Sequence, residues 1–290
     1  MFKGSLVPIV TPFKNGKFDE KAYADLIEWH ISQGTHGIVP CGTTGEASTL
    51  DFKEHYRAIE VAVKAVNKRI PVIAGTGANA TDEAILITKK AKALGADGAL
   101  IVTPYYNKPT QEGLYLHFKA ISEAVDIPIV LYNVPGRTAV NMLPATVARL
   151  LEFKNIVGIK EATGDMRQAS DLVRLCGNRL TLFSGDDFTT FTMLTLGGKG
   201  VMSVTANIAP KYVAEMCNAW EKGNIKKARE LHYKLEPLNN AMFIETNPIP
   251  VKTALALMGR IEEDFRLPLC SMSTVNKEKL VGVLENAGLI

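Results

Sequence analysis

Short apolar runs alternate with helix-like segments along most of the chain. Successive runs begin 20 to 34 residues apart, a spacing that is typical of strand–loop–helix units and too long for hairpins. Several runs are apolar at nearly every position, as expected for strands buried on both faces of a parallel sheet. The eight predicted strands begin at Ser5, Ile38, Val72, Ala99, Ile129, Ile156, Thr181 and Val201.

Helix start and stop signals fill the segments between these runs. Asp19-Glu20 opens a segment with apolar residues at helical spacing, and Gly34 ends it. Thr81-Asp82-Glu83 places a capping hydroxyl and two acids at the start of another predicted helix, which ends at Gly95. Eight such units predict an α/β fold, the (β/α)8 or TIM barrel; seven or fewer would predict an open, doubly wound sheet.

The strand pattern stops after Gly223-Asn224. The remainder carries apolar residues at helical spacing, including the run V-K-T-A-L-A-L at 251–257. No linker rich in glycine and serine separates the two parts, so we expect them to pack together. We predict a catalytic barrel over residues 1–224 and a small C-terminal helical domain over residues 225–290.

Composition narrows the classes of function. The 290 residues include 33 Lys plus Arg against 30 Asp plus Glu, a formal net charge of +3, and 47% are hydrophobic, which excludes long disordered tracts. The basic residues are scattered, which disfavours nucleic acid, and no apolar run reaches the ~18 residues of a membrane helix. The N-terminal residues lack the pattern of a signal peptide. The four cysteines are far apart and the five histidines lack metal-ligand spacing, so we expect reduced thiols, a cytoplasmic protein and no metal site.

Lys160 is the most unusual residue of the predicted barrel. It follows the apolar residues I-V-G-I of the sixth strand, and barrel active sites lie at the carboxyl ends of strands. Desolvating an ammonium group is costly, and a lysine held as a neutral amine is a nucleophile toward carbonyl carbons. Position alone also allows a plainer interpretation, in which Lys160 extends to water or pairs with Glu161.

Other strand ends carry groups that suit a small carboxylate. The turn G-T-T-G after the second strand offers the hydroxyls of Thr43 and Thr44 with flexible backbone amides, although the same turn could simply cap the next helix. Tyr132 ends the fifth strand, where it would serve either as a proton shuttle beside an imine or as a structural phenol. Arg137 lies five residues on, either at the surface or at the barrel mouth, where it would bind a carboxylate bidentately.

A segment that fits a nucleotide-binding pattern is disfavoured by its place in the chain. G-T-G-A-N-A at 75–80 fits G-x-G-x-x-A, but it follows the third predicted strand instead of the first. No acidic residue closes the next strand about 20 residues on. A P-loop is also missing, so we expect no nucleotide cofactor. The G-x-S-x-G motif of a hydrolase nucleophile is missing as well.

Together these strand ends resemble the pyruvate-dependent class I aldolase superfamily, which contains N-acetylneuraminate lyase and dihydrodipicolinate synthase. The resemblance covers essentially the whole chain, and its specific features are the G-T-T-G-E turn at 42–46, the tyrosine at 132 and the G-x-K-E lysine at 160. The segments Y-Y-N at 105–107 and Y-N-V-P-G-R-T at 132–138 are similar to the dihydrodipicolinate synthase branch. Lyases of sugar acids usually lack the arginine of P-G-R-T.

This resemblance implies condensation of pyruvate with L-aspartate 4-semialdehyde through a lysine Schiff base, the first committed step towards lysine and diaminopimelate, without a metal or nucleotide. Lys160 would form the imine, while Tyr132, Thr43 and a partner subunit's Tyr106 would relay protons. The alternative is a lyase or aldolase that acts on a keto sugar acid through the same imine. A barrel that only binds ligands is disfavoured by the intact residue set. The implied substrate-binding residues are Thr44, Met202, Arg137 and Gly185.

The resemblance also implies an assembly and a regulator. The family is typically a homotetramer, built as a dimer of tight dimers, and in many members lysine inhibits by binding at the tight-dimer interface. Phe52 stands where lysine-sensitive relatives often carry a histidine, so lysine inhibition stays an open question. The positions that match the lysine site are Ser48, His55, Asn79, Glu83 and Tyr105.

Overall fold

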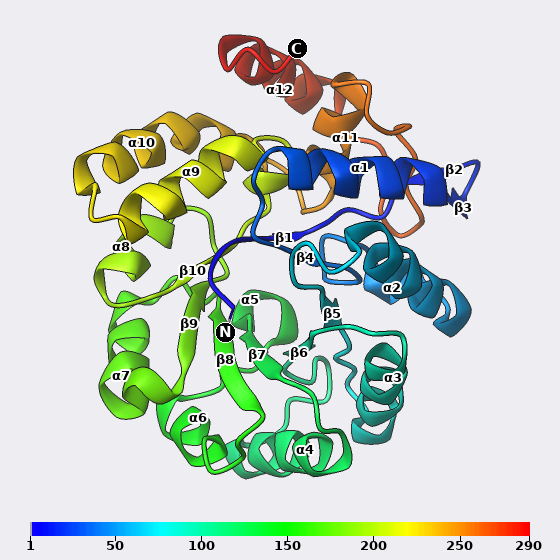
Figure 1. The fold of residues 1–290 in the computed structure, drawn as a ribbon. Helices are drawn as coiled ribbons and strands as arrows, with labels where there is room; N and C mark the ends of the chain where they lie inside the picture. The colour runs from blue at the N-terminus through cyan, green and yellow to red at the C-terminus, as the bar shows by residue number, and fades with distance from the viewer. Residues whose placement is uncertain (1) are drawn as a thin grey trace.

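The computed structural model describes residues 2–290 and forms a barrel of parallel strands ringed by helices (Figure 1). The strand order is β4-β1-β10-β9-β8-β7-β6-β5, and every neighbouring pair is parallel. A bridge between Ile38 and Val72 joins the two ends of this order. The predicted (β/α)8 fold is therefore confirmed. Its strands are β1 (Gly4–Pro8), β4 (Gly37–Val39), β5 (Ile73–Gly75), β6 (Gly98–Val102), β7 (Ile129–Asn133), β8 (Ile156–Glu161), β9 (Thr181–Ser184) and β10 (Gly200–Met202).

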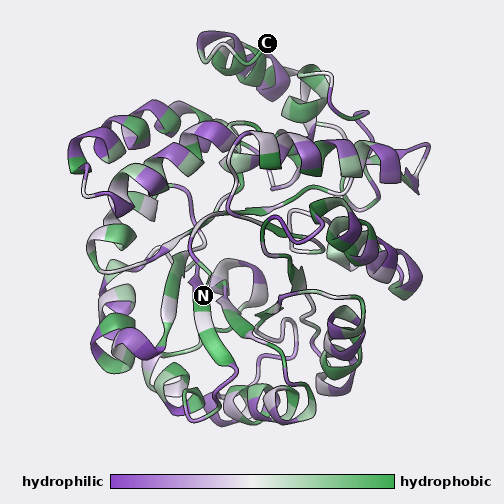
Figure 2. Cartoon of the chain, viewed as in Figure 1, coloured by the Kyte–Doolittle hydropathy of each residue, from purple (hydrophilic) through white to green (hydrophobic). Residues whose placement is uncertain are grey.

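Helices surround the barrel as one layer, with apolar faces toward the strands and polar faces outward (Figure 2). The barrel helices are α1 (Glu20–Ser32), α2 (Phe52–Val66), α3 (Thr81–Ala93), α4 (Gln111–Ala124), α5 (Pro135–Thr138), α6 (Pro144–Leu150), α7 (Met166–Cys176), α8 (Thr190–Thr195) and α9 (Pro210–Glu221). The short elements are the hairpin β2 (Phe13–Lys14) and β3 (Lys17–Phe18) and the 3-10 turns η1 (Ala47–Thr49), η2 (Gly177–Arg179) and η3 (Thr205–Asn207).

Side-chain caps fix where several helices begin. Asp19 accepts a hydrogen bond from a first-turn amide of α1, as its place before the helix predicts. The predicted hydroxyl cap of α3 is wrong, because Ala80 occupies the N-cap position. Thr81 already lies inside the helix, and its hydroxyl is instead 3.0 Å from Nδ1 of His117 on α4. The hydroxyl therefore ties two neighbouring helices together.

The eighth barrel strand is shorter than the sequence predicts. β10 ends at Met202, and residues 205–207 form a 3-10 turn where the apolar run predicts more strand. The buried carboxylate of Asp187 accepts hydrogen bonds from the backbone amides of Val204 and Thr205, at 2.9 and 3.2 Å. These amides are consequently satisfied outside a strand ladder, and the chain turns at the barrel mouth.

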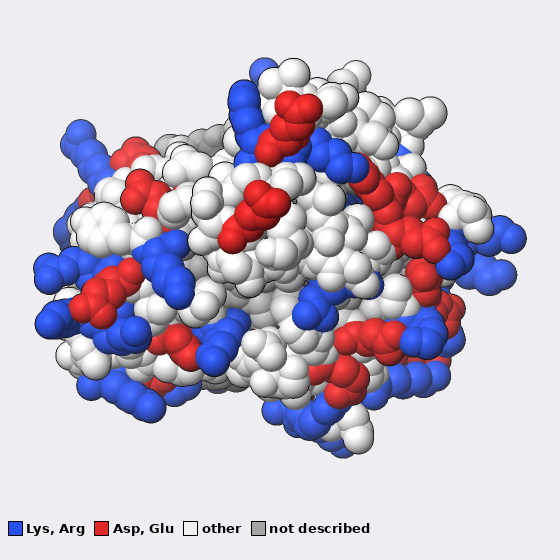
Figure 3. All heavy atoms as spheres, turned by 90° about the horizontal axis from the view of Figure 1, so that it is seen from above, with Lys and Arg blue, Asp and Glu red and all other residues white. Residues whose placement is uncertain are grey.

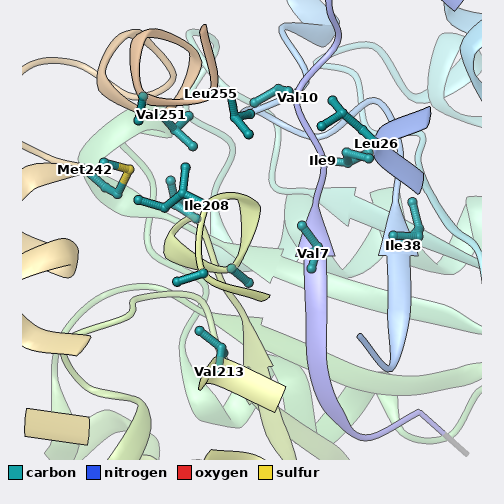
Figure 4. Packing of buried hydrophobic residues seen from close by; sticks show 14 of the residues in the cluster. Val7, Ile9, Val10, Leu26, Ile38, Ile208, Val213, Met242, Val251 and Leu255 are labelled. Atoms are coloured by element: carbon teal, nitrogen blue, oxygen red, sulfur yellow. The ribbon is translucent and has the colours of Figure 1, made fainter. Parts of the chain in front are cut away.

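Three helices follow the barrel, and they share its apolar core. Val251 and Leu255 of the second of them belong to the same cluster of buried residues as Val7 of β1 and Leu26 of α1 (Figure 4). The predicted boundary after residue 224 coincides with the start of the first of these helices. The division into two domains stays a prediction, since one continuous core spans the boundary. The three helices are α10 (Ile225–Ala241), α11 (Ile249–Leu257) and α12 (Thr274–Asn286).

Charged side chains of both signs are interspersed over the face drawn in Figure 3. Across residues 2–290, no helix is both long enough and apolar enough to cross a bilayer. The same residues contain no cluster of three side chains suited to hold a metal ion. All four cysteines are free thiols, and only Cys270 is exposed.

Candidate active site

A cavity of about 140 Å³ lies where the carboxyl ends of β7, β8 and β9 approach one another. We call it the inner cavity. The structure brings together there six of the eight catalytic and substrate-binding residues predicted from the sequence. These six lining residues are Thr43, Thr44, Tyr132, Arg137, Lys160 and Gly185.

Met202 and Tyr106 do not line the inner cavity. Met202 is fully buried in an apolar cluster inside the barrel that also contains Tyr132, and Val204 reaches the cavity wall two residues later. Tyr106 follows β6 with a φ of 75° and is 90% exposed. A side chain so exposed is available to another molecule and not to the site of its own chain.

Lys160 extends from β8 into the barrel, and only 5% of its surface is exposed. Its register partner on β7 is Tyr132, whose ring centroid lies 4.2 Å from the Lys160 Nζ. Glu161 points to the opposite face of the sheet, as adjacent strand residues do, and forms no ion pair with Lys160. The pairing considered as the plainer interpretation is therefore wrong. The Tyr132 ring thus packs against the buried amine, which places a phenol next to the position where an imine would form.

Gly185 leaves the space that the lysine side chain occupies. A Cβ at this position would lie 2.7 Å from the Cβ of Ala162 and 3.0 Å from the Cγ of Lys160. Real side chains do not approach so closely, so any larger residue would displace the lysine. The backbone amide of Gly185 donates a 2.7 Å hydrogen bond to the carbonyl of Glu161.

The turn that carries Thr43 and Thr44 has an unusual backbone. Cys41 and Glu46, which flank it, have left-handed φ values of 55° and 53°. Such conformations cost about 1–3 kcal/mol each in residues other than glycine, so surrounding contacts must hold them. Thr44 is buried, whereas Thr43 is partly exposed and faces the cavity.

Two residues of the C-terminal segment hold this turn. Lys252 of α11 forms an ion pair with Glu46 at 2.5 Å, and both side chains are almost completely buried. Asn247, just before α11, donates from Nδ2 to the Thr44 hydroxyl at 3.0 Å. Burial lowers the pKa of Lys252, against the opposing effect of the Glu46 carboxylate. The segment between α10 and α11 therefore forms one wall of the site, and α11 supports the turn opposite.

Sequence reasoning missed both of these contacts. Lys252 stands within the apolar run V-K-T-A-L-A-L, so the anomaly that singled out Lys160 was present a second time. Asn247 precedes a proline, a common turn signal, and nothing local indicates that the turn reaches the barrel mouth.

Arg137 lies on the single helical turn α5 at the end of β7. Its Nη2 donates to the backbone carbonyl of Asn247 at 3.2 Å, and the residue lines the inner cavity while remaining exposed to solvent. A guanidinium at the mouth of a cavity can bind a carboxylate bidentately.

The other residues that line the inner cavity are one acid, one amide and four apolar residues. Asp186 lines it, and burial raises the pKa of this carboxyl group. Val204 and Phe243 supply apolar wall, and the Phe243 ring lies 5.9 Å from that of Phe188. The positive groups thus face a small space with both polar and apolar walls, which suits a short substrate.

A second cavity of about 390 Å³, which we call the outer cavity, adjoins the first. The two share Thr43, Tyr132, Val134 and Arg137 in their walls. Five of the positions considered for lysine inhibition line the outer cavity, and Asn79 does not. The five are Ser48, Phe52, His55, Glu83 and Tyr105.

Burial favours the neutral forms of two polar groups in the outer cavity. His55 Nε2 is 2.9 Å from the carbonyl of Gly75, and burial lowers the pKa of its imidazole. Burial raises the pKa of Tyr105, and the nearby Glu83 carboxylate raises it further. A neutral histidine, a neutral phenol and a carboxylate suit a ligand with an ammonium group.

Comparison with known proteins identifies the family. Residues 1–287 match the model of the dihydrodipicolinate synthetase family. A relative named 4-hydroxy-tetrahydrodipicolinate synthase, from Thermodesulfovibrio yellowstonii, is 74% identical over 290 residues and all of both chains.

Solved structures agree with this assignment. A chloride-inhibited dihydrodipicolinate synthase from Acinetobacter baumannii, complexed with pyruvate, is 52% identical over all of both chains, with a TM-score of 0.98. A dihydrodipicolinate synthase from Cyanidioschyzon merolae with lysine bound is 40% identical, with a TM-score of 0.96, over 100% of this chain and 99% of that one. The resemblance inferred from the strand ends is confirmed, and the chain belongs to the dihydrodipicolinate synthetase family.

Proposed function

We propose that the protein condenses pyruvate with L-aspartate 4-semialdehyde to give 4-hydroxy-tetrahydrodipicolinate. The observation that carries the proposal is a buried lysine, Lys160, beside the Tyr132 ring in a cavity that also presents Thr43, Thr44 and Arg137. The names of the relatives support the choice of reaction. This reaction is the first committed step towards lysine and diaminopimelate.

The chemistry follows from the positions of these groups. The Lys160 amine attacks the keto carbon of pyruvate, and loss of water gives an imine that acts as an electron sink. Loss of a methyl proton gives an enamine, whose carbon attacks the aldehyde of the second substrate. The amino group of the second substrate then attacks the imine carbon, which closes the ring and releases the Lys160 amine. Tyr132 and Thr43 relay protons during these steps. No metal or nucleotide is needed in this scheme.

Carboxylates of the two substrates have separate sites in the proposal. The pyruvate carboxylate is held by the Thr44 hydroxyl, the backbone near Met202 and the Gly185 region. The carboxylate of the semialdehyde is bound by Arg137. Arg137 is the group that disfavours the alternative, a lyase or aldolase for a keto sugar acid. The apolar wall of Val204 and Phe243 also fits a short acceptor better than a polyhydroxylated one.

The exposed Tyr106 supports a shared site. We propose that it completes the proton relay of a second copy, within a homotetramer built as a dimer of tight dimers. The exposed Tyr105, at the same loop, would lie in that dimer interface. Activity should then fall in Tyr106→Phe, and sedimentation should show no fully active monomer.

The free cysteines fit the reducing cytoplasm, where we place the enzyme.

Borohydride trapping tests the proposal. Wild-type protein treated with pyruvate and borohydride should carry a reduced pyruvyl group on the tryptic peptide that contains Lys160. Lys160→Ala should abolish this label, whereas Lys154→Ala, at an exposed position in the turn before the same strand, should retain it. Label that persists in Lys160→Ala would contradict the assignment. Turnover with a panel of aldehydes should be greatest with L-aspartate 4-semialdehyde, and greater turnover of a sugar-derived aldehyde would favour the alternative.

A further inference from the structure

A cluster of polar side chains lies behind the reactive pair, on the outer face of the barrel. Tyr132 pairs with Lys160 in the register of β7 and β8, and Asn133 pairs with Glu161 at the next position. Successive residues of a strand point to opposite faces. Since Tyr132 and Lys160 face the interior, Asn133 and Glu161 lie directly behind them, under α7.

Hydrogen bonds join the side chains of this outer cluster. Asn133 Nδ2 donates to Glu161 Oε2 at 3.1 Å, and Gln168 Nε2 of α7 donates to the same oxygen at 3.2 Å. The amide of Thr163 donates to the other carboxylate oxygen at 2.9 Å. Asn141 exchanges hydrogen bonds with Gln168 in both directions, at 2.9 and 3.1 Å. The Glu161 carboxylate is thus bound by three neutral donors.

A contribution to folding stability does not by itself explain why the acidic side chain of Glu161 is buried behind the reactive pair. Glu161 is fully buried, and its carboxylate pairs with no cation within residues 2–290. Burial raises the pKa of this group, against the effect of the hydrogen bonds. Well-packed apolar side chains in such places are often as stabilising as charged ones. Hydrogen bonds to a carboxylate are, however, stronger than those between neutral groups, and three donors on one carboxylate fix its orientation.

The cluster is connected to the reactive pair through the backbone. The carbonyl of Asn133 accepts from the amide of Ala162, and the carbonyl of Glu161 accepts from that of Gly185. Gly185 is the residue whose close packing leaves room for the lysine chain. A shift of Glu161 therefore moves the Cα of Lys160 and the wall against which its side chain rests. Asn133, Glu161 and Gln168 do not line the inner cavity, so they do not contact substrate.

We propose that Asn133, Glu161 and Gln168 are positioning residues, which fix the Lys160 amine relative to the Tyr132 ring from outside the barrel. The inference rests on the proposed function, because it assumes that Lys160 forms the imine. Rates of this kind depend steeply on alignment, and a displacement near 1 Å can cost about 100-fold. The cluster therefore governs the rate of imine formation more than the affinity for pyruvate.

Glu161→Gln is the sharpest test, because it keeps the side-chain volume. The new amide must present N–H groups either to Thr163 or to Asn133 and Gln168, all of which are donors. We expect imine formation with pyruvate, quenched by borohydride and measured by mass, to slow by about 10- to 100-fold, while KM for pyruvate changes by less than about threefold. Glu123→Gln, an exposed glutamate of α4, is the matched control and should leave both values unchanged.

The outcomes separate the two claims. Absence of the reduced pyruvyl group on Lys160 in the wild-type protein would refute the proposed function. Wild-type label with an unchanged rate in Glu161→Gln would overturn the positioning role, even if the variant melts at a lower temperature. If Glu161→Gln fails to fold, Gln168→Met removes one of the two donors to Oε2 and is read in the same way. A rate in Gln168→Met equal to that of Glu123→Gln would then refute the inference.

Discussion

The buried ion pair between Lys252 and Glu46 allows a quantitative stability prediction. At 2.5 Å and an effective dielectric constant of about 20, the attraction between the two charges is about 7 kcal/mol. Desolvation of each ion costs several kcal/mol, so the intact pair contributes little net stability. Lys252→Met removes the ammonium but leaves the carboxylate buried without a cation. We expect this variant to lose about 3–5 kcal/mol of unfolding free energy.

Urea unfolding at pH 7 measures this loss, at one fixed protein concentration because subunit assembly contributes to apparent stability. The double variant Lys252→Met with Glu46→Gln leaves no unpaired charge, so it should regain most of the loss. The matched control is Lys277→Met, whose pair with Glu263 is partly exposed. It should cost no more than about 1 kcal/mol.

Two results would refute the reasoning. The first is a loss in Lys252→Met as small as that in Lys277→Met, which would mean that the Glu46 carboxylate finds water or another partner. The second is a loss in the double variant equal to the sum of the losses measured in Lys252→Met and in Glu46→Gln alone, which would mean that the two side chains act independently.

Of four further predictions, three concern the site and one concerns the stability of the fold. Gly185→Ala should fold but slow imine formation by about 100-fold, because its Cβ displaces the Lys160 chain, and borohydride trapping measures the rate. Arg137→Ala should form the imine at the normal rate but lose about 30-fold or more in kcat/KM for the semialdehyde, and equal loss in both steps would make the arginine structural. Burial raises the pKa of Asp187 to about 6, above its ordinary 3.8. Between these two pH values the carboxyl group is protonated in the folded protein and ionised in the unfolded chain. The contribution of this group to the unfolding free energy therefore falls by up to about 3 kcal/mol as pH rises from about 4 to about 6, and urea unfolding should show this fall in wild type but not in Asp187→Asn. Millimolar L-lysine should inhibit, with the effect lost in Glu83→Ala, and a flat titration of activity would leave the outer cavity without this role.

The barrel and most of its site were predictable because their signals are local. Parallel strands buried on both faces are continuous apolar runs, and helices between them set a long, regular spacing. The carboxyl end of each run then marks the site, which is how Lys160, Tyr132 and Arg137 could be grouped before any contact was known.

The remaining features depend on contacts between distant parts of the chain. Asn247 and Lys252 reach the turn at 42–46 from about 200 residues away, and helical periodicity does not say over which strand ends a later helix folds. The early end of β10 is set by the Asp187 carboxylate of the preceding unit, while its own sequence remains apolar. At the end of β10, tertiary hydrogen bonds override the local strand propensity.

Four residues form a wall common to the inner and outer cavities, so occupants of the two spaces are neighbours. Any equilibrium effect between such neighbours is reciprocal: a compound that weakens pyruvate binding by some factor is itself weakened by pyruvate through the same factor. Inhibition by an end product bound in the outer cavity would then depend on the concentration of the end product relative to that of pyruvate, and not on the end product alone. Plentiful pyruvate would raise the amount of end product needed to slow the pathway.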